Sequence, residues 1–303
     1  MKNAFLGLAL GGGGARGAAH VGVLKVLEKN KIIPEVISGT SIGAIIGAMF
    51  AFKPDADWIS HKLQEFLMNP DTLFHSSLQM MNNRNFETLL ENSTKKIDNK
   101  FAVVIGQNRS QIVKRDVIDE MIEFLIPVKR FEELNIRLKV VASDIQTGNE
   151  ESYEKGDLVE AISRSCSIPG YVKPTKDGDS IIVDGGVTSP IPIDTIRDEC
   201  EFLIAINIDR GKLPKLKNPN MLEIIKRSDL ISNRRLAELN LKNADYVISP
   251  DVLGLHWSEY NQFSLLVENG IKATEKEITM LNEKIRRESN LFHKMEKIFT
   301  LSS

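Results

Sequence analysis

Three short glycine-containing segments hold the residues of this chain whose types and spacing suit a chemical reaction. They read G-G-G-G-A-R-G at 11–17, G-T-S-I-G at 39–43 and D-G-G at 184–186. Consecutive backbone amides can bind an oxyanion, a serine on a tight turn can be a nucleophile, and a carboxylate can be its base. The segments therefore indicate acyl transfer through a serine. None of the three contains a histidine.

Ser41 is the central residue of a G-x-S-x-G segment. The flanking Gly39 and Gly43 permit a sharp turn from strand to helix, and a helix beginning at Ile42 would direct the positive end of its dipole at developing negative charge. The alternative is a serine that merely caps a helix, since helices often begin near Gly and Ser. Because the segment lies between a short predicted strand and an apolar predicted helix, we favour the nucleophile.

The first glycine run also matches the dinucleotide-binding pattern G-x-G-x-x-G at Gly12, Gly14 and Gly17. That interpretation requires an acidic residue at the end of the following strand, about 20 residues on. Glu35 is at that distance but precedes the strand at 36–38. We therefore predict that the amides of Gly13 and Gly14 form an oxyanion hole, with Arg16 holding the loop or adding positive potential. A tight loop for close packing explains fewer of the glycines.

Asp184 is the predicted base because it follows the apolar run 181–183, at the carboxyl end of a strand, where α/β sites gather. Gly185 and Gly186 leave room for another segment or a substrate. The alternative is an ordinary Asp-Gly turn. In the order serine, acid, histidine, only His256 or His293 could complete a triad, and neither has a motif around it. His20 is expected to have a packing role.

The elements that must position these residues repeat the order strand, glycine turn, helix. This order predicts an α/β fold of three layers, with a largely parallel central sheet covered by helices on both faces. Strands are predicted at 4–10, 36–38, 138–143, 181–183, 202–208 and 246–248. Helices are predicted at 18–30, 42–52, 55–68, 87–96, 116–125 and 157–166. We expect one domain at 1–250, with a helical extension at 251–303 packed on it.

Two further segments are expected outside the sheet. Residues 69–85 carry large apolar side chains without a clear period, and are predicted to be either a flap over a pocket or an irregular packed loop. From Ile271 the apolar residues recur in heptads through Phe299, which predicts a long amphipathic helix. Thr274 and Glu288 interrupt the seam, so docking on the domain is favoured and homodimerisation through this stripe is the alternative.

Composition excludes several classes of protein. A net charge of −2 gives no reason to expect nucleic acid as a partner. Two cysteines make no disulfide framework, which fits a reducing, cytoplasmic compartment. No apolar stretch approaches the roughly 20 residues that span a bilayer, so any membrane contact is expected to be peripheral. The short apolar start precedes no cleavage site and is expected to be the first strand.

The three motifs, in this order, resemble the patatin-like phospholipase family, particularly its compact bacterial members of the neuropathy-target-esterase type. V-A-S-D-I-Q-T-G at 141–148 and S-C-S-I-P-G at 165–170 extend the resemblance. It implies a Ser41–Asp184 dyad without histidine or metal, and an oxyanion loop formed by Gly12, Gly13, Gly14 and Arg16. It also implies hydrolysis of acyl esters in phospholipids, lysophospholipids or simpler lipids through an acyl-enzyme. An acyltransferase and a nucleotide-binding module remain the alternatives.

Overall fold

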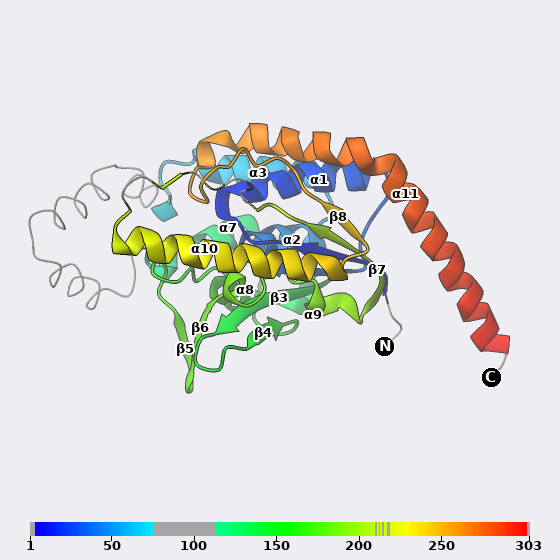
Figure 1. Cartoon of the computed structure of the whole chain (residues 1–303), viewed down its shortest axis with the longest axis horizontal. Helices are drawn as coiled ribbons and strands as arrows, with labels where there is room; N and C mark the ends of the chain where they lie inside the picture. The colour runs from blue at the N-terminus through cyan, green and yellow to red at the C-terminus, as the bar shows by residue number, and fades with distance from the viewer. Residues whose placement is uncertain are drawn as a thin grey trace, which may run out of the picture.

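The computed structural model describes residues 4–74, 113–209, 211, 213, 215–216 and 219–301 (Figure 1). The helix predicted at 87–96 and the larger part of the segment 69–85 lie outside these residues. Within the described part of the chain, no helix is both long enough and apolar enough to cross a bilayer.

The described residues form one eight-stranded sheet in the order β5-β6-β3-β2-β1-β7-β8, with β4 paired to β3. Its strands are β1 (Ala4–Leu10), β2 (Val36–Thr40), β3 (Arg137–Asp144), β4 (Glu150–Tyr153), β5 (Thr175–Asp177), β6 (Ser180–Asp184), β7 (Cys200–Ile206) and β8 (Tyr246–Ile248). The central strands β3, β2, β1, β7 and β8 run parallel. Leu10 pairs with Gly39, so the glycine loop after β1 and the Ser41 turn after β2 leave the same edge.

Helices cover both faces of the sheet (Figure 1). They are α1 (Ala18–Lys29), α2 (Ile42–Phe52), α3 (Ala56–Met68), α7 (Arg115–Leu125), α8 (Leu158–Ser165), α9 (Asp194–Arg197), α10 (Met221–Asn240) and α11 (Phe263–Leu301). Single turns of 3-10 helix are η1 (Gly14–Gly17), η2 (Phe131–Glu133), η3 (Gly185–Val187), η4 (Leu241–Asn243) and η5 (Tyr260–Gln262).

Alternating side chains of β7 divide the core in two. Phe202 and Ile204 join the large cluster beneath α1, α2, α3, α7, α8 and α11, whereas Leu203 and Ala205 join a smaller one with Ile196 of α9 and Ala237 of α10. Successive residues of a strand point to opposite faces, so one strand supplies both cores. The predicted three-layer α/β/α architecture is confirmed.

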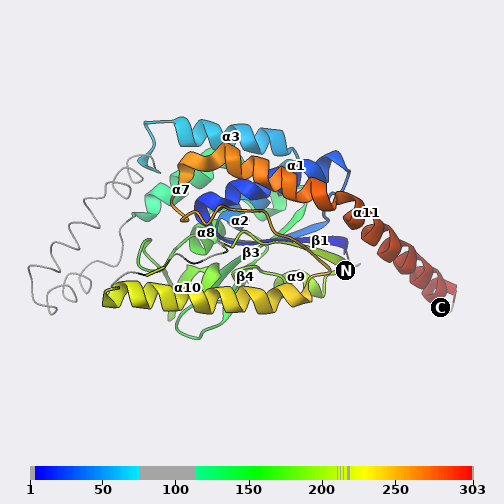
Figure 2. The ribbon, with the colours of Figure 1, turned by 45° about the horizontal axis from the view of Figure 1, so that its top comes forward.

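The C-terminal helix α11 begins at Phe263, ahead of the heptad pattern that starts at Ile271. It packs on α1 where Gly22 meets Gly270, and a Cβ added to either glycine would overlap backbone atoms of the other helix. Thr274 is fully buried there, and its hydroxyl donates to the Gly270 carbonyl at 2.9 Å, which explains a polar residue on the seam. Beyond this docked part the helix extends away from the domain (Figure 2). Homodimerisation stays a prediction that sedimentation with and without this extension would test.

Helix α10 was not predicted because it lacks a core-facing apolar stripe. Its Met221, Ile224 and Ile225 are exposed, whereas Ala237 is buried. A signal was nonetheless present: Asn220 and Glu223 form a capping box, in which each side chain accepts a hydrogen bond from the other's backbone amide. The short strands β4 and β5 also escaped prediction.

Candidate active site

Ser41 lies on a strained turn between β2 and α2, with φ of 55° and ψ of −123°. Close approach explains the glycines on either side of it. A Cβ at Gly39 would lie 2.5 Å from the Gly43 carbonyl oxygen, and one at Gly43 would overlap the Leu10 carbonyl. The Ser41 side chain makes no capping hydrogen bond to α2, so capping does not account for this serine.

The Ser41 hydroxyl lies near the carboxylate of Asp184 and stabilises its ionised form. Asp184 ends β6 and is buried, with 7% of its surface exposed. Burial raises the pKa of Asp184 to about 6, and hydrogen bonds from the Ser41 hydroxyl and the Gly186 amide oppose that rise. The Gly186 amide donates to Oδ1 at 2.7 Å. The fold thus brings the two predicted residues together and gives the carboxylate a raised basicity.

Neighbouring elements hold the Asp184 turn in place. A Cβ at Gly185 would overlap the Val141 carbonyl of β3, so this glycine allows the turn to lie against the sheet. The Gly186 carbonyl accepts a hydrogen bond from Asn233 of α10. The helix that the sequence did not predict therefore helps to position the carboxylate.

In the glycine loop, the Gly12 amide donates to the Pro190 carbonyl at 2.9 Å. In this arrangement Gly12 does not present its N–H to a substrate, although a Cβ added to Gly12 would lie 3.5 Å from that of Ser41. Gly14 has φ of 55°, and a Cβ there would overlap the Trp257 carbonyl. Nε of Arg16 donates to the Gly13 carbonyl at 3.1 Å. Of the two roles predicted for Arg16, this contact agrees with holding the loop.

Gly17 and His20 support the glycine loop by close packing and by a hydrogen bond. A Cβ at Gly17 would overlap Ile42, so Gly17 allows η1 to pack on α2. His20 is fully buried, and its Nε2–H donates to the Gly11 carbonyl at 2.8 Å. Burial lowers the pKa of His20 to about 4, which keeps the ring neutral. Its structural role agrees with the expectation from sequence.

The remaining histidines have different surroundings. Nδ1 of His256 lies 2.8 Å from the Ser258 hydroxyl, and the ring packs on Trp257. His256 does not line the pocket beside Ser41. His293 belongs to the part of α11 whose side chains are not described, and His75 lies outside the described residues.

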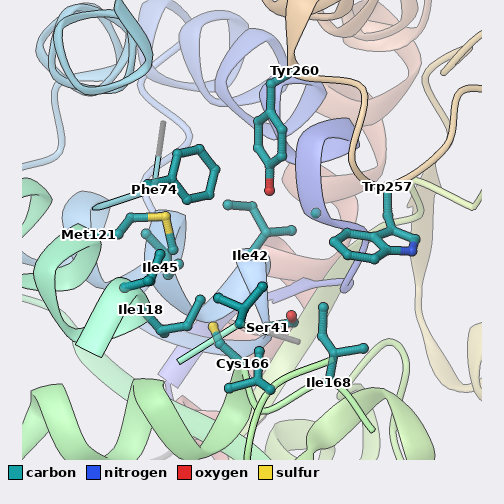
Figure 3. A pocket seen from close by; sticks show the side chains of 14 residues that line it. Ser41, Ile42, Ile45, Phe74, Ile118, Met121, Cys166, Ile168, Trp257 and Tyr260 are labelled. Atoms are coloured by element: carbon teal, nitrogen blue, oxygen red, sulfur yellow. The ribbon is translucent and has the colours of Figure 1, made fainter. Parts of the chain in front are cut away.

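A pocket of about 630 Å³, including its open mouth, borders Ser41 (Figure 3). Its lining is mostly apolar and comes from Gly14, Ser41, Ile42, Ile45, Phe74, Val113, Val117, Ile118, Met121, Cys166, Ile168, Val172, Trp257 and Tyr260. Phe74, from the segment predicted to be either a flap or a packed loop, is buried and packs edge-on against Tyr260 at 5.1 Å between ring centroids. Sequence reasoning assigned no role to Trp257 or Tyr260, because an isolated aromatic residue in a loop gives no signal.

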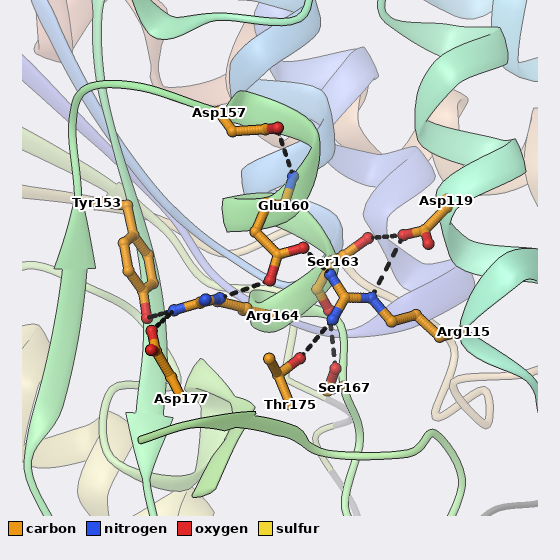
Figure 4. Close-up of polar contacts among 10 residues, drawn as sticks. All are labelled: Arg115, Asp119, Tyr153, Asp157, Glu160, Ser163, Arg164, Ser167, Thr175 and Asp177. Atoms are coloured by element: carbon orange, nitrogen blue, oxygen red, sulfur yellow. Dashed lines mark hydrogen bonds and ion pairs between the residues drawn. The ribbon is translucent and has the colours of Figure 1, made fainter. Parts of the chain in front are cut away.

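A polar network braces α7, which lines this pocket, against α8, which ends just before the lining residue Cys166 (Figure 4). Arg115 of α7 pairs with Glu160 of α8 and donates to the Thr175 hydroxyl at 2.6 Å. Arg164 of α8 pairs with Asp177 of β5 at 2.7 Å. These charge-assisted bonds fix α8 between α7 and the edge of the sheet.

Residues 8–196 match the family model described as patatin-like phospholipase. The match covers more than half of the chain and includes both Ser41 and Asp184. This chain belongs to the patatin-like phospholipase family. Membership confirms the resemblance seen in the motifs.

The patatin-like relatives come from several kinds of organism. A patatin-like phospholipase domain-containing protein of Caenorhabditis elegans is 27% identical over 296 residues, covering 88% of this chain and 20% of that protein. An NTE family protein of Mycobacterium tuberculosis is 27% identical over 210 residues, covering 69% of this chain and 31% of that protein. Human patatin-like phospholipase domain-containing protein 6 is 28% identical over 207 residues, covering 67% of this chain and 13% of that protein. The chain thus spans less than a third of each of these relatives, which do not single out bacterial members.

Proposed function

We propose that this chain hydrolyses acyl esters of lipids, with Ser41 as the nucleophile and Asp184 as the general base. The observation that supports this most directly is the strained turn of Ser41 near a buried carboxylate, that of Asp184, whose pKa is raised to about 6 by burial. An aspartate at its ordinary pKa of about 3.9 is a feeble base toward serine. A pKa near 6 brings the base closer to neutral pH while leaving it mostly ionised.

In the first half of the proposed reaction, Asp184 takes the proton of the Ser41 hydroxyl while Oγ attacks the acyl carbonyl. The amides of Gly13 and Gly14, rather than that of Gly12, donate to the oxyanion of the tetrahedral intermediate. When the intermediate collapses, the protonated Asp184 gives its proton to the departing alkoxide. The alcohol part of the lipid leaves, and the acyl chain remains esterified to Ser41.

In the second half, Asp184 takes a proton from water as the water oxygen attacks the acyl-enzyme. Collapse of this second intermediate returns the proton to Ser41 and releases the fatty acid. The strained turn at Ser41 supports both steps, because it presents Oγ clear of α2 and beside the glycine loop. Arg16 supports them by holding the loop through the Gly13 carbonyl.

The pocket beside Ser41 indicates the substrate class. Side chains such as Ile45, Ile118 and Met121 offer apolar surface, and burial of an acyl chain gains about 0.8 kcal/mol per methylene group. We therefore propose that the pocket holds the acyl chain of a phospholipid, lysophospholipid or simpler ester. A nucleotide-binding module is disfavoured, because a phosphate or ribose would find few polar partners in this lining. Cytoplasmic location and peripheral membrane contact stay predictions.

Labelling with a fluorophosphonate tests the proposal. The wild-type chain should react at Ser41, and Ser41→Ala should abolish both labelling and the hydrolysis of p-nitrophenyl esters and phospholipids. Thermal stabilisation by NAD or ATP without labelling would contradict the proposal. Adding alcohol or thiol acceptors to the assay and measuring the ratio of transferred to hydrolysed acyl groups separates a hydrolase from an acyltransferase.

A further inference from the structure

Residues 165–167, at the end of α8, touch the backbone of both proposed catalytic residues. The Ser41 amide donates to Oγ of Ser165 at 2.8 Å. The Asp184 amide donates to the Ser167 carbonyl at 2.9 Å. The S-C-S motif at 165–167 therefore forms hydrogen bonds with the backbone of both proposed catalytic residues.

The hydroxyl of Ser165 has a fixed orientation. It is fully buried and donates to the Val141 carbonyl of β3 at 2.5 Å, so its lone pairs are free to accept from Ser41. The Ser41 amide precedes the first turn of α2, where backbone N–H groups have no partner within the helix. Because Ser41 is itself buried, its N–H requires an acceptor, and Ser165 supplies it.

The segment is in turn held from the other side. Oγ of Ser167 donates to the Ser163 carbonyl at 2.8 Å, so the backbone of Ser163, not its hydroxyl, holds the segment. Between the two serines, Cys166 is buried and lines the same pocket as Ser41. The end of α8 is therefore a firm support on which the Ser41 turn rests.

We propose that Ser165 is a positioning residue for acyl transfer: its hydroxyl ties the Ser41 turn to the Val141 carbonyl, so that Oγ of Ser41 points at Asp184. This inference rests on the proposed function. The Val141 carbonyl is also the backbone group against which Gly185 packs. The Val141 carbonyl of β3 thus contacts both turns. It accepts a hydrogen bond from Ser165, which binds the Ser41 amide, and it packs against Gly185, next to Asp184.

The test compares Ser165→Ala with Ser163→Ala. Both remove a fully buried hydroxyl from α8, but the Ser163 hydroxyl bonds to Asp119 and not to either catalytic backbone. Ser165→Ala should lower kcat by about tenfold to a hundredfold with little change in KM, since small misplacement of a nucleophile carries such a cost. The pH below which the activity of Ser165→Ala falls should also move to a higher value, because Asp184 loses hydrogen bonding from Ser41, which lowers its pKa. Ser163→Ala should show neither effect.

A second pair of variants guards against a general loss of packing. Ser165→Thr and Ser165→Val have nearly the same shape, and only the first keeps a hydroxyl. We expect Thr to retain clearly more kcat and fluorophosphonate labelling than Val, with both measured at a temperature at which each variant is fully folded. Equal kcat in Thr and Val, or in the two alanine variants, overturns the inference. An inactive, unlabelled wild-type chain would instead overturn the proposed function, so the two failures are distinguishable.

Discussion

Ser41 lies near Asp184 where little of either residue reaches solvent, and its hydroxyl stabilises the ionised form of the Asp184 carboxylate. The same burial that excludes water raises the pKa of the carboxylate to about 6. The ionised form of Asp184 is the one that can act as a base, but burying its charge costs folding free energy. Activity and stability should therefore both depend on pH.

The pH dependence of kcat/KM should show an acid limb near pH 6. Asp184 acts as a base only when ionised, so activity should fall about tenfold per pH unit once the pH drops well below that pKa. Initial rates on a soluble ester between pH 4 and 8 measure the limb. A limb near pH 4 would mean that the carboxylate has its ordinary basicity.

Asp184→Asn should lose activity and gain stability at pH 7. The folded pKa of about 6 lies above the ordinary 3.8, so ionising Asp184 destabilises the fold as the pH rises through 6. Asparagine stays neutral and can still accept from Gly186. The gain should reach roughly 3 kcal/mol above pH 7 and vanish below pH 4. Urea unfolding of both chains at several pH values checks this; a destabilised variant at pH 7 would contradict it.

His256→Ala and His293→Ala should keep most of the esterase activity. The His256 ring lies against Trp257 and does not line the pocket at Ser41. Since an ordinary histidine also titrates near pH 6.5, these variants decide which group produces the acid limb. Loss of activity in a folded His256→Ala chain would favour a triad.

Met121→Trp should shift the preference toward short acyl chains. The Met121 side chain lines the pocket (Figure 3), and a larger ring there would take space from a long chain. We expect kcat/KM for a long-chain p-nitrophenyl ester to fall about tenfold or more, with the acetate ester nearly unaffected. Met280→Trp, on the exposed face of α11, is the matched control. Equal loss on both esters would show that the pocket does not hold the chain.

Gly270→Ala should destabilise the fold by about 1–3 kcal/mol. In a solvent-exposed helix this change would stabilise by about 0.5–1 kcal/mol, so the sign is diagnostic. The added Cβ would overlap the Ala19 carbonyl and force α11 away from α1. Lys272→Ala, whose ion pair with Glu268 is more than half exposed, should change little. Thermal unfolding compares the three chains.

Local patterns in the sequence were sufficient to predict much of the fold. The bounds of β1 and α2 agree with the structure because each is an apolar run ended by Gly11 or Lys53, and those of β8 agree because its apolar run ends at Ser249 and Pro250. Helix α10 was missed because tertiary packing requires little of its surface to be apolar. Ser165 was visible in a motif, but no local pattern gave it a partner.

The sequence alone determined the glycine turns, the serine between two of them and the aspartate after an apolar strand, since these depend on the conformations that neighbouring residues allow. Tertiary structure decided which groups meet. It directed the Gly12 amide to Pro190, placed Ser165 under Ser41, and buried Asp184 so that its pKa rises to about 6. Hydrogen bonds and desolvation act through space between segments far apart in the chain, so only the folded protein specifies them.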